Sequence, residues 1–144
     1  MKYNKTVLKN GIRIVTVPMQ GTQTATVMVM VGVGSRYETE NQAGLSHFIE
    51  HMLFKGTEKR PTAQSISEEL DGIGGEFNAF TAADKTAYYA KVDSRHIEKA
   101  LDVISDIFLN SQIPPPQSYE AHLRTYLTLV KLDLFLYLFP LAPT

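Results

Sequence analysis

The sequence of 144 residues contains no cysteine. This absence excludes a disulfide scaffold, a thiol nucleophile and a zinc site built from cysteine. Any metal bound by this chain must therefore be held by histidine and carboxylate side chains. Together with the absence of a signal peptide and of a transmembrane segment described below, the lack of cysteine leads us to expect a cytoplasmic, reducing compartment.

The sequence also lacks an excess of charge of either sign. It has 14 lysines and arginines against 15 aspartates and glutamates, for a net charge of −1. No basic field is available to hold a polyphosphate, so nucleic acid is not expected as a partner. Long hydrophobic runs are absent too, because the uncharged segment 134–144 is far shorter than the roughly 20 residues of a transmembrane helix. The N-terminal segment MKYNKTVLKNG lacks the apolar core of a signal peptide.

Strand-like and helix-like segments follow one another without a strict alternation. Two β-branched runs flank turn residues that include Pro18 and Gly21, and they predict two strands. Near the other end, apolar residues recur at helical spacing after a cap at Asp93 or Ser94. The predicted strands span residues 11–17, 24–33, 76–80 and 86–92, and the predicted helices span residues 44–55, 61–71 and 94–110. This order predicts an α+β fold with a single mixed or mainly antiparallel sheet and helices packed on one face.

The composition changes after Ile113. Three consecutive prolines precede a leucine-rich stretch with few charges. We expect a domain boundary here, with an incomplete domain over residues 1–112 and a divergent, proline- and leucine-rich tail over residues 113–144. A strand formed by residues 132–139 would be mostly apolar on both faces, which is an aggregation hazard when such a strand is exposed.

The segment GLSHFIEHMLFKG contains His47, Glu50 and His51 in the pattern HxxEH. At about 100° per residue, the three side chains of a helix project toward one patch. Two imidazoles one turn apart can occupy neighbouring corners of a tetrahedral Zn²⁺ site. The adjacent carboxylate then lies close to a zinc-bound water, and Glu50 would be the general base for hydrolysis of a peptide bond.

An amphipathic helix that happens to carry two histidines is the alternative. Its core side would consist of Phe48, Ile49, Met52 and Leu53. By average composition, however, the HxxEH pattern should arise by chance in only roughly a few per thousand chains of this length, which favours a metal site. The remaining histidines, at positions 96 and 122, belong to no motif and are assigned no role.

Three segments of the chain resemble the inverzincin zinc metallopeptidase family, which includes pitrilysin, insulinase and mitochondrial processing peptidase. They are GSRYETENQAGLSHFIEHMLFKGT at 34–57, GGEFNAFT at 74–81 and DKTAYY at 84–89. The likeness covers about residues 4–112. It implies the N-terminal part of the first domain of a zinc metalloendopeptidase.

The resemblance also implies roles for individual residues. His47 and His51 would be zinc ligands and Glu50 the catalytic base. Asn78, Ala79 and Phe80 would lie on an edge strand and present backbone groups to an extended peptide. Without the zinc helix, GGEFNAFT would indicate only an ordinary edge strand after a glycine turn.

The likeness fails at the third zinc ligand. Family members take this ligand from a glutamate on a later helix, usually within an acidic run, and no such run follows Ile113. Glu120 could serve only if the backbone were rearranged. Family enzymes also have a second related domain that closes over the cleft. We therefore expect a truncated domain that binds Zn²⁺ weakly and has little or no activity alone. Its expected partners are an extended peptide or unfolded protein segment, and a second peptidase-like domain or subunit.

Two other interpretations of the chain stay open. It could be a non-catalytic relative that binds extended peptides or scaffolds an active partner, although such a protein would not need the three motif residues. It could also be a non-functional fragment produced by a shift of reading frame near Ile113, because the likeness ends abruptly there. The alternative to a frameshift is a lineage-specific ending that packs on the sheet and buries residues 132–138.

Overall fold

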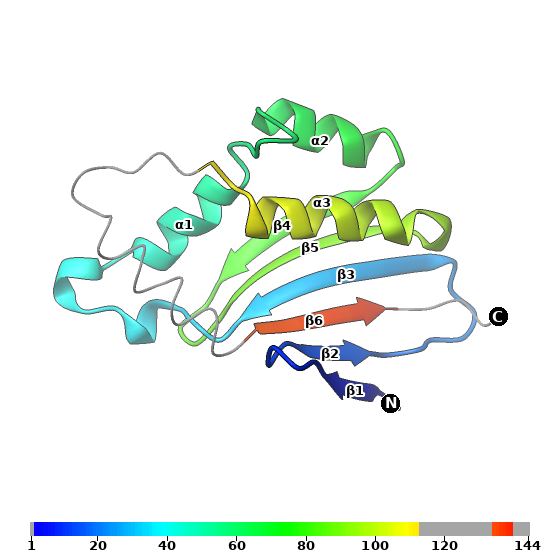
Figure 1. Cartoon of the computed structure of the whole chain (residues 1–144), viewed down its shortest axis with the longest axis horizontal. Coiled ribbons are helices and arrows are strands. Elements are labelled where there is room, and N and C mark those ends of the chain that lie inside the picture. The colour runs from blue at the N-terminus through cyan, green and yellow to red at the C-terminus, as the bar shows by residue number, and fades with distance from the viewer. Residues whose placement is uncertain (1, 113–133, 140–144) are drawn as a thin grey trace.

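The computed structural model describes residues 2–112 and 134–139 of the chain. Within these residues, six strands form one mixed sheet in the order β1-β2-β6-β3-β5-β4 (Figure 1). Neighbouring strands are antiparallel except for β2 and β6, which are parallel. The strands are β1 (Asn4–Val7), β2 (Arg13–Thr16), β3 (Thr24–Val31), β4 (Glu76–Thr81), β5 (Thr86–Asp93) and β6 (Leu134–Phe139). The α+β fold with a single mixed sheet is thereby confirmed.

Three α-helices and three short 3₁₀-helices complete the described fold. The α-helices are α1 (Leu45–Leu53), α2 (Ala63–Asp71) and α3 (Ile97–Leu109), and the 3₁₀-helices are η1 (Ser35–Tyr37), η2 (Glu40–Gln42) and η3 (Ser94–His96). Asp93 caps η3 by accepting a hydrogen bond from the amide of Arg95, as the sequence predicts for the start of this helical segment. Within residues 2–112 and 134–139, no helix is long and apolar enough to cross a membrane.

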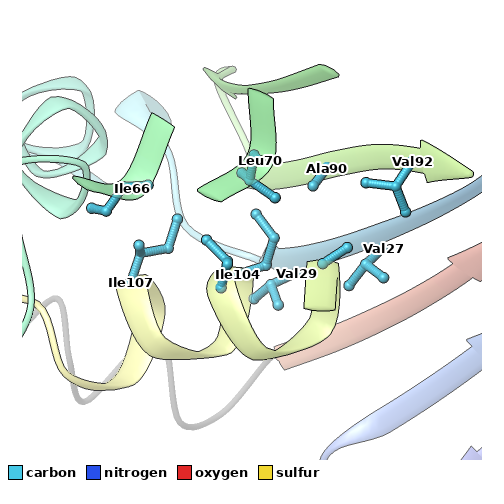
Figure 2. Close-up of a cluster of buried hydrophobic side chains, with 10 residues drawn as sticks. Val27, Val29, Ile66, Leu70, Ala90, Val92, Ile104 and Ile107 are labelled. Atoms are coloured by element: carbon cyan, nitrogen blue, oxygen red, sulfur yellow. The ribbon is translucent and has the colours of Figure 1, made fainter. Parts of the chain in front are cut away.

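All three α-helices cover the same face of the sheet. Alternate residues of a strand point to the same side, and Val27 and Val29 of β3 lie opposite Ala90 and Tyr88 of β5. These side chains meet the apolar faces of the helices in two buried clusters, one of which is drawn in Figure 2. The helix residues in the clusters are Leu45, Ile49 and Leu53 of α1, Ile66 and Leu70 of α2, and Ala100, Val103, Ile104 and Ile107 of α3.

Two strands lie outside the four that the sequence predicts. Every residue of β1 is exposed. Its sequence, NKTV, lacks the alternation of apolar and polar residues that marks a half-buried strand, so the sequence does not predict it. The apolar segment of β6 lies between β2 and β3, inside the sheet rather than at its edge. Neighbours on both sides can then bond its backbone, which removes the hazard expected of an exposed apolar strand. The structure thus places residues 134–139 within the sheet, whereas residues 132 and 133 lie outside the described residues.

Gly34 allows the chain after β3 to approach the turn between β4 and β5. A Cβ atom at Gly34 would lie 2.1 Å from the carbonyl oxygen of Ala82. The amides of Ser35 and Arg36 donate hydrogen bonds to the carbonyls of Ala82 and Ala83, at 3.3 and 2.7 Å. The tip of the β4–β5 hairpin is therefore fixed against the segment that leads into α1.

A buried arginine joins the segment after α1 to α2 and α3. The side chain of Arg60 is fully buried, and its guanidinium donates to Asp106 at 2.6 Å, to Asp102 at 2.5 Å and to Glu69 at 3.0 Å. The Thr57 hydroxyl also donates to Asp106, at 2.7 Å. Burial by itself lowers the pKa of Arg60, but the carboxylates outweigh it and raise that pKa. The arginine therefore stays charged inside the protein.

We expect Arg60→Met to lower the free energy of unfolding by about 3–5 kcal/mol, because it leaves Asp106 buried without its cationic partner. Urea denaturation at pH 7 measures the loss. Lys59→Met is the matched control, since Lys59 bonds to the same Asp102 at 2.7 Å but is 58% exposed. Its removal should cost no more than about 1 kcal/mol. Equal losses in the two variants would contradict the assigned role of Arg60.

Candidate metal centre

Helix α1 buries one face and exposes the two histidines of the HxxEH motif on another. The buried stripe consists of Leu45, Ile49 and Leu53, while His47 and His51 are exposed. Phe48, which the purely structural interpretation assigned to the core side, is 41% exposed. The two histidines take no part in the hydrophobic core, so their imidazoles remain accessible to a metal ion.

The geometry of the two imidazoles fits a shared metal ion. Their Nε2 atoms lie 3.0 Å apart, and the ring centroids are separated by 4.6 Å. Zn–N bonds of 2.0–2.1 Å at two corners of a tetrahedron place the nitrogens about 3.3 Å apart, so a small outward shift is enough. His47 and His51 can therefore occupy two adjacent corners of a zinc site.

A complete ligand set is not found in the part of the chain that the structure describes. No group of three or more His, Cys, Asp or Glu side chains that could hold a metal ion occurs there. Glu120, the candidate third ligand from the sequence, lies outside the described residues, as does His122. His96 lies in η3, remote in the chain from the motif helix.

Glu50 lies on the flank of α1 that faces the sheet. Its side chain is only 9% exposed. The Thr81 hydroxyl, at the end of β4, donates a hydrogen bond to Oε2 of Glu50. No role is predicted for Thr81 from the sequence. The alternation along β4 nevertheless offers a signal, because Phe77, Ala79 and Thr81 share one face of the strand.

The three residues predicted to bind a peptide lie on an edge strand that packs against α1. Strand β4 is the last in the sheet order, so one side of it has no strand partner in the described part of the chain. The Ala79 amide donates to Oδ1 of Asn78 at 2.8 Å, and Phe80 is 37% exposed. The position of Asn78, Ala79 and Phe80 thus suits the addition of an extended strand.

A carboxylate closes the N-terminal end of α1. Glu38 accepts hydrogen bonds from the amides of Gly44 and Ser46, both at 2.7 Å. Burial by itself raises the pKa of Glu38, but the hydrogen bonds from Ser46 and Gly44 outweigh it and lower that pKa below its usual value. Gly44 adopts a φ of 86°, a left-handed conformation that favours glycine. A negative charge at this end also complements the helix dipole, so Glu38 fixes the start of the histidine-bearing helix.

We expect Glu38→Gln to lower the free energy of unfolding by about 1 kcal/mol at pH 7, from loss of a charged cap. Because folding lowers the pKa of Glu38, its stabilisation is complete above the unfolded value of about 4.5 and disappears as the pH falls through the folded value. Denaturation curves of both proteins between pH 7 and pH 3 should therefore converge on the acid side. Glu40→Gln, at an exposed carboxylate in η2, is the control and should change stability by less than about 0.5 kcal/mol. A difference between wild type and Glu38→Gln that is constant with pH would contradict the charged-cap role.

Comparison with known families gives a match over most of the chain. The model for the family described as insulinase, peptidase family M16, matches residues 13–127. The match includes the HxxEH helix and strand β4. The match also extends past Ile113, the residue at which the sequence leads us to expect the family likeness to end.

Individual relatives match about three quarters of the chain. The chain is 48% identical over 109 residues to a protein of Rickettsia felis named an uncharacterized zinc protease, covering 76% of this chain and 26% of that protein. It is 50% identical over 107 residues to the mitochondrial-processing peptidase subunit beta of Dictyostelium discoideum, covering 74% of this chain and 23% of the subunit. The chain thus spans about a quarter of the length of these relatives.

The fold also matches a solved structure. The crystal structure of a protease from Helicobacter pylori superposes with a TM-score of 0.85 and 19% sequence identity, covering 95% of this chain and 46% of that one. At this identity the likeness establishes the fold alone.

Proposed function

The chain belongs to the insulinase family of peptidases, family M16, and from this premise we propose that it forms the N-terminal part of a zinc-dependent metalloendopeptidase. The observation that carries the proposal is the approach of the His47 and His51 Nε2 atoms to 3.0 Å on the exposed face of α1. Names given to its relatives, zinc protease and processing peptidase, support it. Because the chain spans about a quarter of those relatives, the activity of a whole enzyme is part of the proposal.

Each motif residue has a distinct role in the proposed reaction. His47 and His51 would hold the metal through Nε2, and a further ligand, for which Glu120 stays a candidate, would complete the site. When bound, zinc supplies an acidified water and a Lewis acid for the scissile carbonyl. Glu50 accepts the proton of the attacking water at a carboxylate oxygen and can return it to the leaving amine.

The proposed substrate is an extended peptide or an unfolded protein segment that adds to the outer side of β4. Backbone groups of Asn78, Ala79 and Phe80 would form the ladder with it. Oδ1 of Asn78 already accepts the Ala79 amide hydrogen, so an incoming strand has to displace that side chain to use this donor. A second peptidase-like domain or subunit is the proposed partner, in keeping with a relative that is itself named as a subunit.

Zinc binding is the direct test of the metal centre. We expect the dialysed protein to hold much less than one zinc per chain, because two imidazoles leave the metal half solvated. At higher free zinc the site should fill, and His47→Ala or His51→Ala should abolish that binding, whereas His96→Ala should not. Elemental analysis and zinc titration measure both.

Two results would change the interpretation. One tightly held zinc, lost in both histidine variants, would show that Glu120 or another carboxylate completes the site. Zinc binding that is unchanged by both substitutions would contradict the proposed centre.

Catalysis can be followed with a quenched fluorescent peptide. We expect turnover by this chain alone to be near background, because both activation of water and placement of substrate depend on a complete site. Any metal-dependent turnover should disappear in Glu50→Gln, which keeps the size of the side chain but removes the base. Turnover that survives this substitution would exclude Glu50 as the base. Binding of the peptide in the absence of zinc would favour the interpretation of the chain as a non-catalytic relative.

A further inference from the structure

A hydrogen bond between two distant segments restrains the proposed base. Thr81 donates its hydroxyl hydrogen to Oε2 of Glu50, which joins the end of β4 to the flank of α1. Glu50 is 9% exposed, and Thr81 is half-buried. The bond is therefore shielded from competing water, which makes it stronger than an exposed one.

The backbone that carries Thr81 is itself held in place. Thr81 pairs with Thr86 at the end of the β4–β5 ladder, and the Thr86 hydroxyl donates to the carbonyl of Val33 at 2.9 Å. The hairpin tip just beyond is fixed by the close approach of Gly34 to Ala82. The backbone of Thr81 is thus held in place, and from that position its hydroxyl restrains one oxygen of the Glu50 carboxylate.

A carboxylate next to zinc can act either as a ligand of the metal or as a general base, and the hydrogen bond from Thr81 affects which of these Glu50 can be. A glutamate is a good zinc ligand in its own right, and Glu50 lies within one turn of His47 and His51. The three side chains nevertheless form no group able to hold a metal ion together in the described structure. Oε2 of Glu50 is bonded instead to Thr81.

We propose that Thr81 is a positioning residue, whose hydroxyl keeps the Glu50 carboxylate in the place of a base and out of the coordination of the metal. The inference rests on the proposed function and deepens it. Through this hydrogen bond Thr81 also connects β4, the strand proposed to bind the peptide, to Glu50, the proposed base. Thr81→Val removes the hydroxyl but keeps the β-branched shape that suits a strand, and Thr81→Ser keeps the hydroxyl.

Zinc affinity reports the position of Glu50 without requiring turnover. Metal-free wild type, Thr81→Val and Thr81→Ser are titrated with zinc in competition with a chromophoric chelator, and each is repeated with Glu50→Ala. We expect Thr81→Val to bind zinc about tenfold more tightly than wild type, because the freed carboxylate can add a third protein ligand to the two imidazoles. Thr81→Ser should match wild type, and the effect should vanish with Glu50→Ala. Thr26→Val, which removes another strand hydroxyl from β3, is the control and should leave the affinity unchanged.

Two results would overturn the positioning role. They are an unchanged affinity in Thr81→Val, and an equal change whether or not Glu50 is present. A purely structural Thr81 gives one or the other, because its loss does not act through the Glu50 carboxylate.

A second measurement separates this inference from the proposed function. Urea unfolding of the metal-free proteins, as a double-mutant cycle of Thr81→Val and Glu50→Ala, should show that the shift in midpoint caused by Thr81→Val is at least halved when Glu50 is absent. If the midpoint shifts of Thr81→Val and Glu50→Ala simply add, and the chain binds zinc, the positioning role of Thr81 is overturned but the proposed function is not. Coupled shifts with no zinc binding by any variant would overturn the proposed function together with the metal-directed role of Thr81.

Discussion

One apolar layer between the sheet and the helices supports every other feature of the fold. Alternate side chains of β3 and β5, with Val27, Val29 and Tyr88 among them, are buried against all three α-helices. Full burial of a valine or leucine side chain contributes about 1.5–3 kcal/mol, so a layer of this size is the main stabilising term. Because this layer anchors α1 by three residues one turn apart, the opposite side of that helix is free to carry polar groups.

Polar contacts fix the parts of α1 that the apolar layer does not reach. The layer fixes the helix against the sheet but does not fix its ends or its flank side chains. Glu38 closes the N-terminal end, and Thr81 holds Glu50 on the flank. The Arg60 cluster fixes the chain that leaves α1, by tying it to α2 and α3. A helix restrained in this way can present two imidazoles at a nearly constant separation, which a metal site requires.

The sequence was most informative where local periodicity and burial agree. The helix α3 follows from apolar residues such as Ile104 at helical spacing, and β3 follows from a β-branched run between turn signals. The exposed strand β1 has no such pattern, so nothing local distinguishes it from a loop. At the site, the HxxEH spacing predicts the pair of histidines. It does not predict Glu38 or Thr81, because each contact joins segments whose relative position is set only by the folded backbone.

The place of β6 in the sheet has a consequence for the order of folding. This strand comes late in the chain, yet it separates β2 from β3, which are consecutive strands near the N-terminus. The β1–β2 hairpin can form locally, but it cannot pair with the rest of the sheet until residues 134–139 are available. Such long-range pairing slows folding and leaves strand edges open in the meantime. A folding intermediate without β6 would therefore consist of a two-stranded piece, β1–β2, and a three-stranded piece, β3–β5–β4, each with an open edge that β6 occupies in the described sheet.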